Sequence, residues 1–384
     1  MKIGIDHMAF VTQDTYLAAE ELAQARGIAP SKLLTGIGIR EIAIARPGDD
    51  VVSLAANAGA KALAESGVSP ADIGLLIVGT ESAEDKSKPT ATHVHELLGI
   101  GPRCRVYDIV HACAGATYGV LSAIDWLHNP SHRYALVVAS DIARYGRGSL
   151  GEPTQGAGAV AMVIARDPRL VALTEIGTFS RNVWDFWKPL DKKYPIVDGL
   201  YSTQCYNEAA SHCFEGVEGD LGAAFLYHIP YPKLVQQAHA RVVSGLNKGA
   251  DWRPHYETHV APSVVFPARV GNIYTGSLWL ALMSLLENSS PQGHSGAYLF
   301  SYGSGCGSVL MRGEFGPGTV ERASLFGLES LLNARQRITM TEYERLADLY
   351  ESAAPPPPGP DELGRGPFAF TGIRDDQRSY TKVA

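Results

Sequence analysis

Short apolar runs alternate along the chain with longer segments in which apolar residues recur every three or four positions. The runs at 73–80 (IGLLIVGT) and 133–141 (RYALVVASD) are rich in aliphatic residues and predict buried strands. The Ala-rich segment 51–66 and the segment 114–128 predict helices next to them. Such an alternation favours an α/β fold, in which helices cover both faces of a largely parallel or mixed sheet.

The second half of the chain repeats this pattern. The segment 277–287 (SLWLALMSLLE) is apolar nearly all round, which predicts a buried helix, and 297–302 (AYLFSY) predicts the strand that follows it. Each half also contains a Gly-punctuated run that enters an apolar strand, at 156–165 and at 303–311. These parallels predict two similar halves packed against each other.

The boundary between the halves is predicted near residue 166, which gives an N-terminal half of residues 1–165 and a C-terminal half of residues 166–384. Near the end, the Pro/Gly-rich segment 353–367 predicts an extended surface connection, because proline fixes φ and removes amide donors. The aromatic residues of the tail at 368–380 are suited to docking back onto the body.

The composition is that of a soluble globular protein, since 45% of the 384 residues are hydrophobic and 19% are charged. The formal net charge of −7 argues against a nucleic-acid partner, which would need a basic face. The chain does not begin like a signal peptide, and no apolar stretch approaches the roughly 20 residues that cross a bilayer. We therefore expect a cytoplasmic protein with no membrane partner.

The sequence predicts no metal site. Its five cysteines include no CxxC pair, so neither a disulfide framework nor a zinc site of the paired-cysteine type is expected. His93 and His95 lie two positions apart on a predicted helix and therefore face different sides of it. The HEXXH and P-loop patterns are absent as well.

Cys113 is a candidate nucleophile because of its local context. The apolar strand predicted at 106–110 runs into a turn of small residues and then into a helix, which places Cys113 at or next to the helix N-terminus. Unpaired amides and the helix dipole favour the thiolate there and predict a lowered pKa. A buried structural cysteine fits this segment equally well, and we interpret the other four cysteines as structural.

A cysteine nucleophile needs a base, and two residues are candidates. Glu81 follows directly on the strand predicted at 73–80, at the strand end where open α/β sheets place their sites, and partial burial would raise its pKa. A solvated loop acid is the alternative interpretation. His228 precedes an Ile-Pro bend and is either an acid–base group or a histidine of the core.

Several segments, taken in this order and spacing, resemble the hydroxymethylglutaryl-CoA synthases of the thiolase superfamily. They are GTESAEDKSKP (79–89), HACAGAT (111–117), SDIARYG…GEPTQGAGAVAM (140–162), DFWKP…VDG (185–199), YHIPYPK (227–233), GNIYTGS (271–277), SYGSG (301–305) and the GI-DD-RSY tail. The resemblance covers nearly the whole chain. It implies a thiolase-like five-layer αβαβα body of two related halves, which forms a homodimer. It also implies that the substrates are coenzyme A thioesters and that no cofactor is needed.

The resemblance also implies roles for the matching residues. Cys113 would be acetylated by acetyl-CoA, and Glu81 would take a proton from the acetyl methyl group, so that the resulting carbanion attacks the ketone of acetoacetyl-CoA. His228 would orient the second substrate and protonate the new alkoxide. Water would release 3-hydroxy-3-methylglutaryl-CoA for the mevalonate pathway. The amides of Cys113 and Ser304 would form an oxyanion hole for the thioester. The other implied substrate-binding residues are Asn272, which would bind the acetoacetyl group, Lys233 and Tyr302.

Three positions depart from the family pattern. Ala114 stands where relatives often have tyrosine, which predicts either open space beside the nucleophile or the loss of a group that shapes the acyl pocket. Gln237 replaces a lysine that relatives often carry, which predicts weaker binding of the CoA phosphates, and Cys306 is expected close to the site.

Three other functions remain open. A relative in polyketide β-branching would take acyl groups from an acidic acyl carrier protein, which calls for a basic rim with candidates Arg40, Arg103, Arg144 and Arg147. A decarboxylating condensing enzyme would not need Glu81, so the combination of Glu81, Cys113 and His228 argues against it. The third alternative is a non-catalytic scaffold subunit.

Overall fold

The computed structural model of the protein describes residues 1–247, 249, 251–352, 357–364 and 366–382. The Pro-rich connection predicted at 353–367 therefore lies in part outside the described residues. The remaining part of it contains one short 3₁₀ turn, Pro360–Glu362.

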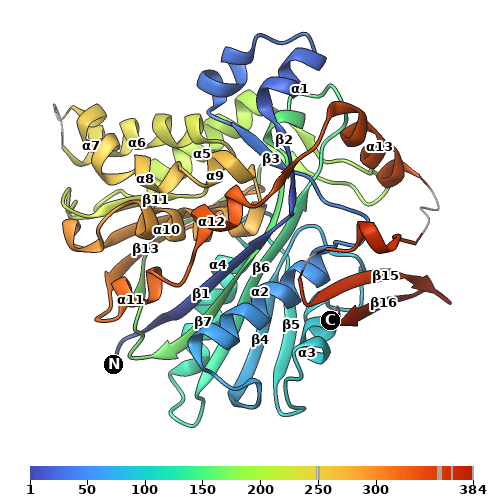
Figure 1. Ribbon diagram of the computed structural model, residues 1–384. Coiled ribbons are helices and arrows are strands. Elements are labelled where there is room, and N and C mark those ends of the chain that lie inside the picture. The colour runs from blue at the N-terminus through green and yellow to red at the C-terminus, as the bar shows by residue number, and fades with distance from the viewer. Residues whose placement is uncertain (248, 250, 353–356, 365, 383–384) are drawn as a thin grey trace.

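A nine-stranded mixed sheet forms the centre of the molecule, in the order β11-β12-β13-β8-β1-β7-β6-β4-β5 (Figure 1). From one edge to the other, the strands are β11 (Ala224–Tyr227), β12 (Ala297–Gly303), β13 (Gly307–Phe315), β8 (Val171–Ser180), β1 (Ile3–Thr12), β7 (Gly156–Arg166), β6 (Tyr134–Ala143), β4 (Ile73–Gly79) and β5 (Arg105–Ile109). β4 runs parallel to both β5 and β6, and β11 is parallel to β12, whereas the other neighbours are antiparallel. β1 and β8 share only the pairs Gly4–Ala172 and Ile5–Val171, so this contact joins two groups of strands.

The helices predicted from the sequence are confirmed within a residue or two at each end. α2 (Val51–Ser66) and α4 (Gly115–Leu127) cover opposite faces of the sheet, because Gly59 of α2 lies against Leu136 and Gly119 of α4 lies against Val137. Adjacent residues on a strand point to opposite faces. α10 (Ser277–Asn288) is buried from Ser277 to Leu286, in agreement with its apolar surface.

The remaining elements surround this body. The helices are α1 (Ala19–Ala25), α3 (Thr90–Leu97), α5 (Gly199–Cys213), α6 (Pro232–Leu246), α7 (Trp252–His259), α8 (Ala261–Val264), α9 (Pro267–Val270), α11 (Thr319–Ala323), α12 (Leu328–Asn333) and α13 (Met340–Glu351). The small sheets are β14 (Gln336–Arg337) with β2 (Thr15–Ala18) and β3 (Glu41–Ala43), β9 (Phe186–Trp187) with β10 (Ile196–Val197), and β15 (Phe368–Arg374) with β16 (Gln377–Lys382).

The predicted docking of the C-terminal tail is confirmed. β15 and β16 form a hairpin that lies beside α2 and α3 (Figure 1). The Asn57 side chain on α2 accepts a hydrogen bond from the Phe368 amide at 2.8 Å and donates one to the Phe368 carbonyl at 2.9 Å. Since Phe368 is also buried, the base of the hairpin is part of the folded body.

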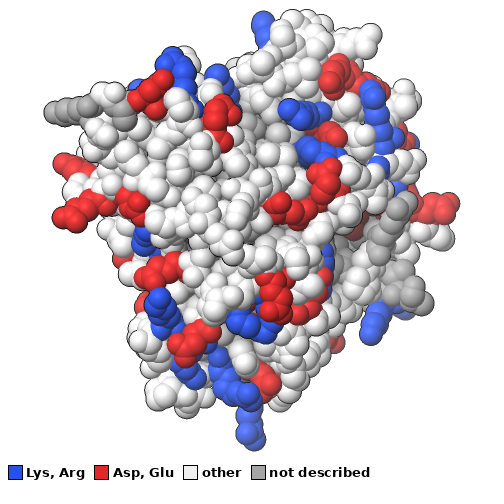
Figure 2. Space-filling model, turned by 60° about the vertical axis from the view of Figure 1, so that its left-hand side comes forward, with Lys and Arg blue, Asp and Glu red and all other residues white. Residues whose placement is uncertain are grey.

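The surface carries charges of both signs, and acidic and basic side chains are interspersed on the face shown in Figure 2. No helix within the described ranges combines the length and the apolar character needed to cross a membrane.

Candidate active site

Parallel pairing brings Glu81 and Cys113 to the same edge of the sheet. β4 ends at Gly79, two residues before Glu81, and the parallel β5 ends at Ile109, shortly before Cys113 and the start of α4. The Cys113 thiol donates a hydrogen bond to Glu81 Oε1 at 3.2 Å. The structure thus joins the predicted nucleophile to the predicted base.

The prediction of a lowered Cys113 pKa is wrong for this site. Burial raises the pKa of the thiol well above its usual value, and the carboxyl groups of Glu81, Asp141 and Asp185 raise it further. Together, burial and these negative charges raise the pKa of the thiol by more than the helix N-terminus lowers it, and the helix N-terminus is the only one of these features that the local sequence indicates. Burial and the charge of Asp141 also raise the pKa of Glu81, to about 8, against the opposing effects of the Cys113 hydrogen bond and Lys188.

Asp141, at the end region of β6, holds the Glu81 segment in place. Its fully buried carboxylate accepts hydrogen bonds from the Glu81 amide at 2.9 Å and from the hydroxyls of Thr80 at 2.9 Å and Ser82 at 2.5 Å. The other oxygen accepts from the amide and hydroxyl of Thr275, at 3.1 and 2.6 Å. One side chain therefore connects the Glu81 segment to the segment that follows Asn272.

A cavity of about 560 Å³ opens on this edge of the sheet. Its lining includes five of the residues predicted for the site, namely Cys113, His228, Asn272, Tyr302 and Ser304. Aromatic side chains form much of the rest, from Tyr145, Phe186, Tyr206 and Tyr274. A partly apolar cavity with a few polar groups is the usual form of a small-molecule site.

Hydrogen bonds fix the orientation of the Asn272 side chain and the position of the His228 backbone. Asn272 Oδ1 accepts from the Tyr274 amide and the Ser277 hydroxyl, both at 2.9 Å, which leaves the amide nitrogen as its available donor. His228 is buried, its backbone carbonyl accepts from the Tyr206 hydroxyl at 2.7 Å, and burial lowers the pKa of its imidazole to about 3. The imidazole is therefore neutral at neutral pH.

Asp185 fixes the Ser304 segment as Asp141 fixes the Glu81 segment. Its buried carboxylate accepts from the Tyr302 hydroxyl at 2.7 Å and from the Gly305 amide at 2.9 Å. The Tyr302 hydroxyl is thus already used as a donor, so Tyr302 offers its ring to the cavity.

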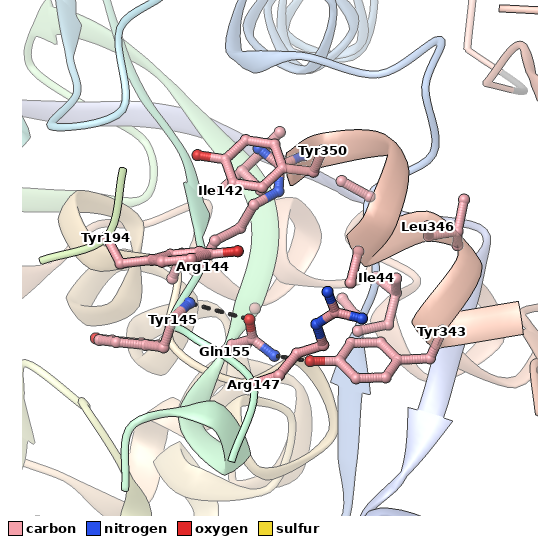
Figure 3. A pocket seen from close by; sticks show the side chains of 15 residues that line it. Ile44, Ile142, Arg144, Tyr145, Arg147, Gln155, Tyr194, Tyr343, Leu346 and Tyr350 are labelled. Atoms are coloured by element: carbon pink, nitrogen blue, oxygen red, sulfur yellow. Dashed lines mark hydrogen bonds between the residues drawn. The ribbon is translucent and has the colours of Figure 1, made fainter. Parts of the chain in front are cut away.

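A second, much smaller pocket of about 50 Å³ lies behind Tyr145, against α13 (Figure 3). The Gln155 side chain bridges it, since it accepts from the Tyr145 amide and donates to the Tyr343 hydroxyl, both at 3.0 Å. The pocket is too small for a thioester substrate, so we interpret it as the support of the Tyr145 wall.

The family models and the relatives identify the chain. The model described as hydroxymethylglutaryl-coenzyme A synthase N terminal matches residues 1–168, and the C-terminal model of the same name matches residues 173–247 and 250–378. A hydroxymethylglutaryl-CoA synthase of Enterococcus faecalis is 37% identical over 356 residues, which cover 90% of this chain and 91% of the relative. The chain belongs to the hydroxymethylglutaryl-CoA synthase family. The family's thiolase-like fold agrees with the mixed α/β body described above.

Solved structures of the family superpose closely on the chain. MvaS in complex with 3-hydroxy-3-methylglutaryl coenzyme A is 36% identical with a TM-score of 0.90, and 99% of each chain is covered. The HMG synthase of the curacin biosynthetic pathway, in complex with an acetyl donor-ACP, is 25% identical with a TM-score of 0.92 over 100% of each chain.

One of the expectations about departures from the family pattern changes with the structure. Ala114 is fully buried and does not line the cavity, and a Cβ added at Gly303 would come within 2.8 Å of its methyl group. The small side chain is thus covered and does not open space beside Cys113. Cys306 lies close to the site, as expected, since it is buried two residues after Ser304, although it is not part of the cavity lining.

Lys233 lies outside the cavity, and the four arginines predicted for a basic rim differ in their surroundings. Lys233 is exposed on the first turn of α6, where its ammonium contacts Gln236 Oε1 at 2.5 Å, and it does not line the cavity. Arg103 lies near the start of β5, the end of the strand opposite to Cys113, and Arg147 pairs with three acids of α13. Arg144 and Arg147 line one pocket with Tyr145, whereas Arg103 lies at the other end of β5, so Arg103 is not part of a basic rim with them.

Asp141 and Asp185 are the site residues that reasoning from single residues missed. The signal was present for Asp141, because an acid that ends an aliphatic strand has the same sequence context as Glu81. Asp185 lies in an irregular segment, and its contacts with the Tyr302–Gly305 strand end exist only in the folded chain.

Proposed function

We propose that the chain condenses acetyl-CoA with acetoacetyl-CoA through an acetyl-Cys113 intermediate and releases 3-hydroxy-3-methylglutaryl-CoA. The observation that carries the proposal is the 3.2 Å contact between Cys113 Sγ and Glu81 Oε1, beside a cavity that His228 and Asn272 line. The printed names of the relatives describe the same synthase activity.

The first step is acyl transfer. A bond forms between Cys113 Sγ and the acetyl carbon, the bond from that carbon to the CoA sulfur breaks, and the departing thiolate takes up the thiol proton. Because the pKa of the free thiol is raised, the thiol keeps its proton until the reaction starts, and the proton leaves as the CoA thiolate departs.

The second step forms the carbon–carbon bond. Ionised Glu81 removes a proton from the acetyl methyl group, and the amides of Cys113 and Ser304 stabilise the enolate oxygen. The methyl carbon then attacks the ketone carbon of acetoacetyl-CoA. His228, a neutral N–H donor, and the free Asn272 amide orient that ketone, and the alkoxide takes its proton through His228. Water finally cleaves the thioester to Cys113.

The proposal extends to assembly and cofactors. The steps are acyl transfer, proton transfer, addition of a carbanion to a ketone and hydrolysis, none of which changes the net oxidation state, so we propose that the reaction uses no redox cofactor and no metal. Among the described strands, β5 has a sheet neighbour on one side only, and Val110 at its end is 72% exposed, which supports pairing with a second copy as a homodimer. We place the enzyme in the cytoplasm and its product in the mevalonate pathway. Lys233 would contact the CoA phosphates from outside the cavity.

Coenzyme A is favoured over an acyl carrier protein as the acyl carrier. Identity to MvaS is 36%, against 25% to the curacin enzyme that was solved with a donor-ACP. Of the four candidate arginines, Arg103 lies at the far end of β5 and Arg147 is already paired with three acids of α13, so neither offers a free charge to an acidic carrier protein at the cavity.

The test is a stepwise assay of the full-length protein. We expect acetyl-CoA alone to add one acetyl group to Cys113, located by peptide mass spectrometry, and subsequent acetoacetyl-CoA to yield 3-hydroxy-3-methylglutaryl-CoA. Glu81→Ala should keep the acetylation and lose the condensation, while Glu96→Ala, an exposed acid on α3, should keep both.

Acetylation only from acetyl-loaded carrier protein would assign the chain to the carrier-dependent branch of the family. Absence of acetylation from either donor would favour the non-catalytic scaffold, and full condensation by Glu81→Ala would overturn the assignment of the base.

A further inference from the structure

The segment that carries Glu81 is anchored firmly on one side only. It joins β4 to α3 and has no regular structure from Thr80 to Pro89. Asp141 binds its first residues, Thr80 to Ser82, whereas residues 83–88 are exposed, apart from the Glu84 side chain, which is only 27% exposed. An exposed segment of this kind needs a second anchor if its first residues are to keep one position.

Arg378, on the C-terminal hairpin about 300 positions away in the sequence, supplies this second anchor. Its Nη1 lies 3.0 Å from Glu84 Oε2, and its Nη2 lies 2.7 Å from Asp50 Oδ2. The guanidinium also lies 4.2 Å from the centre of the Phe370 ring. A planar guanidinium that binds two carboxylates and an aromatic face is held in one orientation.

The hairpin that presents Arg378 is itself fixed to the body. Besides the two hydrogen bonds between Asn57 and Phe368, the Phe370 amide donates to the Gly48 carbonyl at 2.9 Å. Asp50 caps α2 through the Ser53 amide at 2.8 Å. The hairpin is therefore a firm support for the Glu84 side of the segment.

Charge explains why the contact matters. Asp50 and Glu84 are near enough to repel, and burial together with Asp50 raises the pKa of Glu84, while Arg378, Arg144 and Lys188 act in the opposite direction. Arg378 is the cation that bonds directly to both carboxylates. Without it, the two carboxylates repel each other and Glu84 gains by moving towards solvent, which would draw the Glu81 segment with it.

We propose that the C-terminal hairpin is a strap that holds the Glu81 segment through the Arg378–Glu84 ion pair, which makes Arg378 a positioning residue for the condensation step. This inference rests on the proposed function, since it takes Glu81 as the base. Arg378 does not touch the cavity, so it acts by fixing where the Glu81 carboxylate stands relative to Cys113.

The test compares Arg378→Ala, Arg378→Lys, Glu84→Gln and the double variant Glu84→Gln/Arg378→Ala in the wild-type chain. For Arg378→Ala and Glu84→Gln we expect kcat of condensation to fall roughly 10- to 100-fold, with KM and the rate of Cys113 acetylation within about twofold of wild type. Arg378→Lys should recover part of the loss. Glu84→Gln keeps the Arg378–Asp50 pair, so it tests the strap even if Arg378→Ala fails to fold.

The matched control is Arg374→Ala, on the same hairpin, whose side chain is 91% exposed and pairs at 3.9 Å with its neighbour Asp375. It should behave as wild type. In the Glu84→Gln background, adding Arg378→Ala should cost little more, because the pair is already broken.

Wild-type condensation by both single variants, or equal losses of acetylation and condensation, would overturn the strap. So would a full additional loss on adding Arg378→Ala to Glu84→Gln. A wild-type protein that forms no product would instead contradict the proposed function, so the two failures are distinguishable.

Discussion

The pH dependence of condensation follows from the environment of Glu81. Burial and the charge of Asp141 raise the pKa of this carboxyl group to about 8. With that value, the ionised fraction is about 1% at pH 6, about 10% at pH 7 and about half at pH 8. A carboxylate base acts only when it is ionised, so the rate should rise nearly tenfold between pH 6 and pH 7 and level off above pH 8.

A single-turnover assay isolates this titration. The enzyme is first acetylated on Cys113 and then mixed with saturating acetoacetyl-CoA at each pH, and product is measured after rapid quenching. The acetyl thioester removes the thiol from the titration, and burial holds the pKa of His228 near 3, below the range used. Since acetylation also removes the thiol hydrogen bond that lowers the Glu81 pKa, the inflection belongs at about 8 or slightly above.

The result that would refute this reasoning is a rate that is flat from pH 6 to pH 9 and falls only near pH 4.5. Glu81 would then titrate as an ordinary solvated carboxyl group, and burial against Asp141 would not control the reaction. Measuring the affinity for acetoacetyl-CoA at each pH controls for changes in binding.

Three further predictions concern stability and positioning. Because the pKa of Glu81 is raised, its stabilising effect is full below pH 4.5 and is lost as the pH rises through about 8, so Glu81→Gln should gain melting temperature relative to wild type between pH 4 and pH 9. Asp141→Asn places an NH2 group against the donors of Glu81 or of Thr275; we expect a loss of about 3 kcal/mol in urea unfolding together with slower condensation. Tyr206→Phe leaves the His228 carbonyl without its 2.7 Å donor, which should cost about 1–3 kcal/mol and raise KM for acetoacetyl-CoA while acetylation keeps its rate.

The local pattern of apolar and polar residues was sufficient to predict several secondary-structure elements and the positions of two site residues. Continuous aliphatic runs and helical periodicity predicted β4, β6, α2, α4 and α10. They could do so because the burial of one face or of all faces of an element sets the spacing of its apolar residues along the chain. The position of Cys113 before a helix and that of Glu81 after a strand follow from the same local order. Parallel pairing of the two preceding strands then brings them together.

The protonation states could not be predicted in this way. From its own segment, Cys113 has the features of a thiolate, since the nearest electrostatic feature in sequence is a helix N-terminus. In the folded chain, burial raises the pKa of the thiol, and the carboxyl groups of Glu81, of Asp141 (28 positions further along) and of Asp185 (72 positions further along) raise it further, which reverses the sign of the shift. Electrostatic effects depend on distance in space and on desolvation, neither of which the order of residues displays.

The sequence by itself therefore determined the family, several of the main strands and helices, and the Cys113 and Glu81 pair that meets at the sheet edge. Tertiary structure alone decided that Ala114 packs against Gly303, that Arg147 pairs with three acids of α13, and that Arg378 reaches the Glu81 segment. The physical reason is the range of the interactions. Periodicity and capping act over a few neighbouring residues, whereas packing, desolvation and ion pairs join segments that only the completed fold brings into contact.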